Sequence, residues 1–119
     1  MKMKNKIRTY NDGFIYIHKE IPVKTDFSAK KNIKDTDNLS FIVKLAFKEC
    51  SKREQDLDFA EASDRTLNLK VKTRLFKGIN SEHKVILNNT LYDIIYIDED
   101  RLNREMYFYL ERVKVINVE

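Results

Sequence analysis

An almost perfect two-residue alternation between Arg65 and Leu75 constrains the fold of this chain more than any other feature. Because side chains repeat every two residues along a β-strand, this pattern predicts a strand with one buried face and one wet, cationic face. The face expected toward the core consists of Leu67, Leu69, Val71, Thr73 and Leu75, and the opposite face carries Asn68, Lys70, Lys72 and Arg74.

Three apolar segments follow this strand at short intervals. They are separated by residues typical of tight turns, among them Gly78 and the pair Asn88–Asn89, because glycine and asparagine tolerate a positive φ. Short strands at such close spacing favour antiparallel neighbours in a small barrel or sandwich. The three segments are residues 84–89, 90–98 and 104–115, and the charged stretch Asp98–Arg101 marks the last tight connection.

Two further strands are expected before Arg65. The first, Gly13–Lys19, places Ile15 and Ile17 opposite three ring-bearing side chains. The second covers residues 39–49, with Phe41, Val43, Leu45 and Phe47 on one face and Lys44 and Lys48 on the other. The predicted fold class is therefore mainly β: a small antiparallel β-barrel of about six strands, with one short helix and long loops.

The connections on either side of the second strand differ in character. Glu20–Asn38 is polar and non-periodic, so we predict an extended surface connection. In Ser51–Ala62, Ser51 and Glu54 have the spacing of a capping box, which predicts about two turns of helix. This segment has few apolar residues, so a surface helix and an excursion loop both remain open. We expect Glu20–Asn38 and Glu49–Asp64 to be the parts of the chain least protected from hydrogen exchange.

The length of 119 residues predicts a single domain that can bury a core, with residues 1–12 as a flexible basic N-terminal segment. No apolar run approaches the roughly 18 residues that a membrane-spanning helix needs, and no apolar region follows the basic start as in a secretory signal. Cys50 is the single cysteine, which fits a reducing cytoplasm. The net charge of +4 is mild for a nucleic-acid-binding protein.

Candidate catalytic and metal-ligating residues are scattered along the sequence. His18 and His83 are far apart, and neither has a cysteine or histidine neighbour. Asp98–Asp100 superficially resembles a calcium loop but lacks the required glycine and terminal glutamate. The sequence contains no phosphate-binding glycine loop, nucleophile elbow or HExxH motif. We therefore expect no enzymatic activity, no metal and no cofactor.

A small nucleic-acid-binding barrel is the alternative from another functional class. Aromatic and basic side chains on a barrel can form a face on which bases stack. However, tyrosines at alternating strand positions are more often cross-strand packing partners. The residues of this candidate face are Tyr92, Tyr96, Tyr107, Tyr109, Lys70, Lys72 and Arg74.

The order of the segments resembles that of the head-tail joining proteins of long-tailed bacteriophages, also called head closure or stopper proteins. The resemblance spans residues 13–114 and depends on order and spacing. It is carried by FIYIHK, FIVKLAFKE, the acidic REQDLDFAEA, RTLNLKVKTRLFKGIN and REMYFYLERV, and most specifically by HKVILNNTLYDIIYI. The chain departs from the family where Asn89 and Thr90 replace the usual glycine before the Tyr-x-Ile element.

The resemblance implies a non-enzymatic structural protein. Copies would form a ring below the portal and its adaptor, close the DNA exit channel and offer a surface to a tail terminator or tail tube protein. The protein would be made in the host cytoplasm and reside in the virion, beside packaged DNA that it does not bind sequence-specifically.

In such proteins a loop projects into the channel as a plug. By position the candidate is Glu49–Asp64, where the carboxylates would repel phosphate; a surface helix packed on the barrel is the alternative. The candidate plug residues are Glu54, Asp56, Asp58 and Glu61, and the candidate charged interface consists of Lys70, Lys72 and Arg74.

Alternation within adjacent strands also predicts one barrel core. Its expected members are Leu67, Leu69, Val71, Leu75, Val85, Leu87, Ile94, Phe108 and Leu110.

Overall fold

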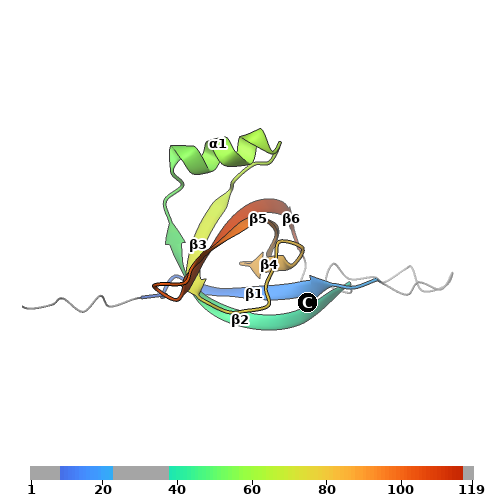
Figure 1. The fold of residues 1–119 in the computed structure, drawn as a ribbon. Helices are drawn as coiled ribbons and strands as arrows, with labels where there is room; N and C mark the ends of the chain where they lie inside the picture. Colours follow the sequence, from blue (N-terminus) through green and yellow to red (C-terminus); the bar gives the residue numbers. More distant parts are fainter. Residues whose placement is uncertain (1–8, 23–37, 117–119) are drawn as a thin grey trace, which may run out of the picture.

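Six antiparallel strands form one closed sheet in the computed structural model, which describes residues 9–22 and 38–116 (Figure 1). The strand order around the barrel is β1-β2-β3-β6-β5-β4, with β4 pairing back onto β1. This confirms the predicted mainly β class, with one short helix. The elements are β1 (Gly13–Glu20), β2 (Leu39–Cys50), α1 (Glu54–Ala62), β3 (Leu69–Arg74), β4 (Lys84–Leu87), β5 (Thr90–Asp100) and β6 (Glu105–Val115).

The barrel interior is built by the alternation that the sequence shows. Ile15 and Ile17 on β1 are fully buried, whereas the residue before each of them, Phe14 and Tyr16, is exposed. Leu69 and Leu75 are half-buried and pack against the same core. The predicted core is confirmed for eight of its nine members, since Leu67 alone lies elsewhere. The fully buried side chains at the centre are Phe108, Ile15, Ile17, Met106, Leu110, Val71, Val85 and Thr73.

Leu67 belongs to a second, smaller cluster outside the barrel. It precedes β3, which begins at Leu69 and not at Arg65, so its side chain does not follow the alternation of the strand. Leu67 packs with Ala60 of α1 and Tyr109 of β6. The expectation that Leu67 lines the barrel core was therefore wrong, and this leucine instead helps to seat α1.

A β-bulge changes the phase of β2. Ile17 pairs with Val43 and His18 pairs with Phe41, so Ile42 is the extra residue on β2. An extra residue moves the side chains beyond it to the other face of the sheet. Phe41 consequently points outward and is 57% exposed, although the sequence placed it on the core face with Val43, Leu45 and Phe47.

The connection between β4 and β5 is a two-residue turn. Asn88 and Asn89 both have positive φ, of 50° and 56°, and Leu87 pairs directly with Thr90. Positive φ at both central residues is the requirement of a type I′ turn, whose twist matches that of the flanking strands. The prediction that the asparagine pair makes this turn is confirmed.

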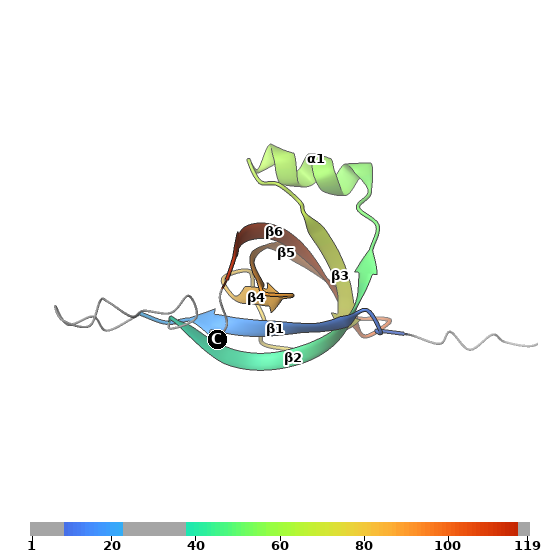
Figure 2. The ribbon, with the colours of Figure 1, turned by 180° about the vertical axis from the view of Figure 1, so that it is seen from behind.

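Helix α1 lies outside the barrel, over β3, β5 and β6, while β1 and β2 lie on the opposite side (Figures 1 and 2). Its N-cap is Arg53, not Ser51, because the Asp56 carboxylate accepts the Arg53 backbone N–H at 3.0 Å. The Glu20–Asn38 connection lies mostly outside the described residues. No helix in the described ranges is long and apolar enough to cross a membrane.

Candidate functional site

A buried ion pair anchors α1 to the barrel. Lys70 Nζ donates to Asp56 Oδ2 at 3.0 Å, and the two side chains are 7% and 5% exposed. Arg53, more than half exposed, donates to the same carboxylate through Nε and Nη2. The Lys70 ammonium also lies 5.5 Å and 5.1 Å from the ring centroids of Tyr107 and Tyr109, within cation–π range.

The electrostatics of this pair keep both groups charged. Burial alone would raise the pKa of Asp56, but hydrogen bonds from Arg53 and Lys70 outweigh it and hold the pKa well below its usual range. Burial would likewise lower the pKa of Lys70, whereas its hydrogen bond to Asp56 and the nearby Tyr109 raise it. The pair is therefore ionised throughout the neutral range and serves to fix the helix.

This arrangement corrects two expectations about charged faces. Lys70 was expected on a wet, cationic face, but α1 covers it and Asp56 neutralises it. Asp56 was a candidate channel-facing carboxylate, yet it points inward to Lys70. Helical periodicity places positions 56 and 60 on one side, and both side chains are buried against the barrel.

The remaining residues of the predicted cationic face have local partners. Lys72 lies 3.6 Å from Glu105, whose carboxylate also accepts the Tyr10 hydroxyl at 2.6 Å. Arg74 lies over the ring of Tyr10, 5.5 Å from its centroid. Lys72 and Arg74 thus share one acidic and aromatic neighbourhood at the start of β6, separate from Lys70.

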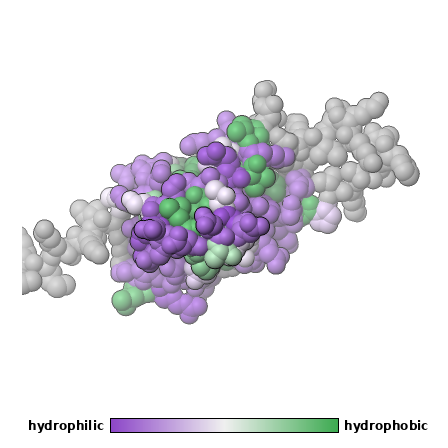
Figure 3. Space-filling view, turned by 90° about the horizontal axis from the view of Figure 1, so that it is seen from above, coloured by the Kyte–Doolittle hydropathy of each residue, from purple (hydrophilic) through white to green (hydrophobic). Residues whose placement is uncertain are grey.

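The outer side of α1 carries an acidic stripe, which we define as Glu54, Leu57, Asp58 and Glu61. These positions are three or four residues apart, so their side chains share one face of the helix. All four are exposed, with Leu57 at 43%. None of the three carboxylates forms an ion pair with another described residue, and the last turn of α1 has no basic residue. Figure 3, seen from the α1 side, shows a mostly hydrophilic surface with small separate hydrophobic patches.

The four tyrosines of the alternative nucleic-acid face do not share one accessible surface. Tyr92 is buried in the barrel core, and Tyr109 is buried beneath α1. Tyr107 is half-buried beside Lys70, and Tyr96 is exposed with Phe59 of α1 edge-on to its ring at 5.5 Å. Stacking of bases needs open ring faces, so helix α1 occupies the place that the nucleic acid would take.

A second exposed surface lies on the opposite side of the barrel and was missed by the sequence reasoning. We call it the aromatic patch, and it consists of Phe14, Tyr16, His18, Phe41 and Lys44. Phe41 lies edge-on to His18, with ring centroids 5.6 Å apart, and 6.5 Å from Tyr16. Lys44 Nζ lies 4.2 Å from the ring centroid of Phe14. The patch depends on the bulge at Ile42, which turns Phe41 outward, and a strict alternation hides that feature.

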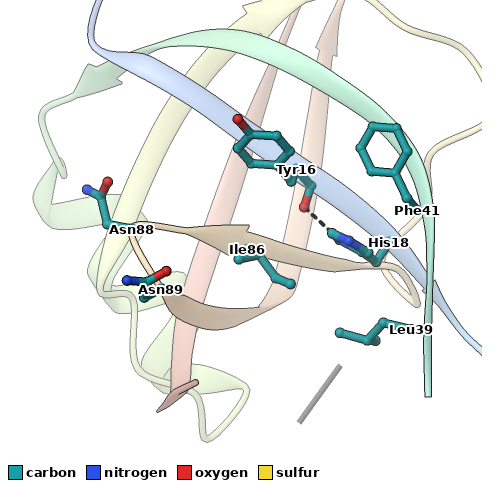
Figure 4. Close-up of a pocket in the computed structure, with 7 residues that line it drawn as sticks. All are labelled: Tyr16, His18, Leu39, Phe41, Ile86, Asn88 and Asn89. Carbon is teal, nitrogen blue, oxygen red and sulfur yellow. Dashed lines mark hydrogen bonds between the residues drawn. The ribbon is translucent and has the colours of Figure 1, made fainter. Parts of the chain in front are cut away.

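An open pocket of about 450 Å³ lies beside this patch, between β1, β2 and the β4–β5 turn (Figure 4). His18 Nδ1 lies 3.1 Å from the Tyr16 carbonyl oxygen, a distance at which the ring N–H can donate to it. Burial lowers the pKa of His18 more than this hydrogen bond raises it, so the ring is neutral at pH 7. The residues lining the pocket are Tyr16, His18, Leu39, Phe41, Ile86, Asn88 and Asn89.

Groups that could support catalysis or metal binding are dispersed in the described ranges. His18 and His83 lie on different elements, and no three His, Cys, Asp or Glu side chains among the described residues are grouped to hold a metal. Burial raises the pKa of the half-buried Cys50 thiol despite nearby lysines, so it stays protonated and weakly nucleophilic at pH 7.

The sequence matches no protein-family model, and no curated protein matches it.

Proposed function

We propose that this chain is a structural subunit of the neck of a long-tailed bacteriophage or prophage. Copies would form a ring beneath the portal and its adaptor, close the DNA exit channel after packaging and present a surface to the tail. The observation that carries the proposal is the order of elements: a small closed barrel with a long β1–β2 connection and an acidic helix between β2 and β3. That order is what the resemblance to head closure proteins implies.

The exposed surface supports an assembly role. The described part of the chain exposes a contiguous aromatic patch on β1 and β2, and exposed apolar patches of this kind mark interaction sites. The charged groups that are buried, Asp56, Lys70 and Glu105, form ion pairs that hold elements of the fold together.

The anchoring of α1 bears on how the channel would be closed. A plug has to leave the barrel surface, whereas α1 is held there by the buried pair of Asp56 and Lys70 and by Ala60. This favours the alternative in which the segment is a surface helix. The proposal therefore assigns channel closure to the ring as a whole and leaves the plug residues unassigned.

The test is removal of the gene from a phage or prophage that encodes this chain. We expect heads that package DNA but lose it, together with free tails that do not attach, and expression of the chain in trans should restore joined particles. Normal, infective particles without the chain would overturn the proposal. Salt-dependent binding of DNA by the isolated chain would favour the nucleic-acid alternative instead.

A further inference from the structure

We infer that the acidic stripe on α1 of one copy docks on the aromatic patch of the next copy. The inference names the subunit contact of the proposed ring and in that respect rests on the proposed function. It assigns a role to two exposed surfaces whose charges are otherwise unneutralised within the described residues.

The two surfaces are complementary in charge. The stripe presents Glu54, Asp58 and Glu61 beside the apolar side chain of Leu57. The patch side of the barrel presents Lys44, and Lys48 lies further along the same outer face of β2. Neither lysine forms an ion pair with another described residue. Oppositely charged surfaces steer two copies together and disfavour the pairing of like surfaces.

The two surfaces also offer an apolar side chain on one copy and an open pocket on the other. Leu57 is the apolar member of the stripe, 43% exposed, and lies at the edge of the stripe that is nearer to the buried Ala60. Tyr16, His18 and Phe41 line an open pocket beside β4, into which one branched side chain can insert. Apolar groups enclosed by charged ones at the edge are the usual composition of a protein interface.

The positions of the surfaces determine the kind of assembly. Helix α1 and strands β1 and β2 lie on opposite sides of the barrel (Figures 1 and 2). A contact between two different surfaces of the same chain is heterologous, so each copy keeps one free surface for the next. Such a contact produces a ring when the rotation closes and a filament when it does not. A nine-residue helix buries little area, so a single contact would be weak and closure of the ring would reinforce it.

Cross-linking with engineered cysteines tests the contact on the pure full-length chain. In a Cys50→Ser background, Leu57→Cys marks the stripe and Phe41→Cys marks the patch. The chain carrying both cysteines, treated with a short bismaleimide, should give a ladder of dimers, trimers and longer products. An equimolar mixture of the two single-cysteine chains should give a dimer with one chain of each kind and nothing longer.

A matched control uses Leu102→Cys in place of Phe41→Cys, because Leu102 is 92% exposed in the β5–β6 turn and lies outside both surfaces. Adding Lys44→Glu to the Phe41→Cys chain should lower its cross-linked yield about ten-fold through like-charge repulsion. Reversing Glu54, Asp58 and Glu61 to lysine on the Leu57→Cys chain should restore that yield.

Four results would overturn the contact. The first is a cross-linked yield for the Leu102→Cys control equal to that for Phe41→Cys, and the second is a dominant dimer between two Leu57→Cys chains. The third is a cross-linked yield that does not respond to the charge reversals. The fourth is failure of the Phe41→Cys thiol to react with a monomaleimide. The last would show that the chain covers its own patch. These outcomes are separate from the phage role: a ladder with normal particles after gene removal would overturn the role and leave the contact standing.

Discussion

Truncation of Asp56 to alanine should destabilise the protein far more than loss of an ordinary surface carboxylate. The change removes hydrogen bonds to a charged group, each worth about 1.5–3 kcal/mol. It also leaves the Lys70 ammonium, 7% exposed, without its carboxylate. The attraction of that ammonium to the rings of Tyr107 and Tyr109 is present in both the wild type and the variant, so it does not offset the loss. Removal of one member of a buried ion pair typically costs about 3–5 kcal/mol, and we expect a loss of that size in the free energy of unfolding.

The assay is urea unfolding of the wild type, Asp56→Ala and the double variant Asp56→Leu/Lys70→Met. Replacing both members of a buried pair by apolar side chains of similar size is often neutral, so the double variant should lie within about 1 kcal/mol of the wild type. Glu99→Ala is the matched control, since Glu99 pairs with the 84% exposed Arg101 and should cost less than about 1 kcal/mol. If Asp56→Ala unfolded at the same urea concentration as Glu99→Ala, α1 would not be anchored by this pair.

Three further predictions concern acid stability, the core and local opening. The folded-state pKa values of Asp56 and of Glu111, which accepts a hydrogen bond from Arg65, lie below the ordinary values. Their contribution to the unfolding free energy is therefore complete above about pH 4 to 5 and is lost as the pH falls further. Asp56→Ala should lose less unfolding free energy than the wild type between neutral pH and pH 2, and an unchanged slope would contradict this. Leu110→Ala, at a fully buried position, should cost about 2–5 kcal/mol and more than Leu69→Ala at a half-buried one, and the reverse order in urea unfolding would show that the core is misplaced. Hydrogen exchange should be faster for the amides of α1 than for those of β3, because a short helix on few contacts opens locally, and equal protection would refute that reasoning.

The sequence predicted those parts of the fold that depend on local pattern. Alternation located β1, β5 and β6 and identified Val71, Phe108 and Leu110 as interior residues. The turn at Asn88–Asn89 was predictable because few residues accept a positive φ at two successive positions.

Features that depend on tertiary contacts were not predictable in the same way. One extra residue at Ile42 turns Phe41 to the outer face of β2, while Val43, Leu45 and Phe47 keep the predicted face, and no property of isoleucine marks a bulge. Lys70 lies at a position that alternation assigns to solvent, and it is buried because α1 folds over β3. The aromatic patch was missed because of the bulge, and the pair of Asp56 and Lys70 was missed because the position of α1 over β3 is a tertiary contact. The sequence held one signal for this ion pair: Asp56 and Ala60 are four residues apart, so the Asp56 carboxylate lies on the same side of the helix as a small apolar residue that can face the barrel.

Electron cryo-microscopy of the neck of virions that encode this chain tests the central claim most directly. We expect a ring of small six-stranded barrels between the portal adaptor and the tail, with α1 of each copy against β1 and β2 of its neighbour. A neck whose density holds no copy of this barrel, in particles that are filled and tailed, would contradict the proposed function.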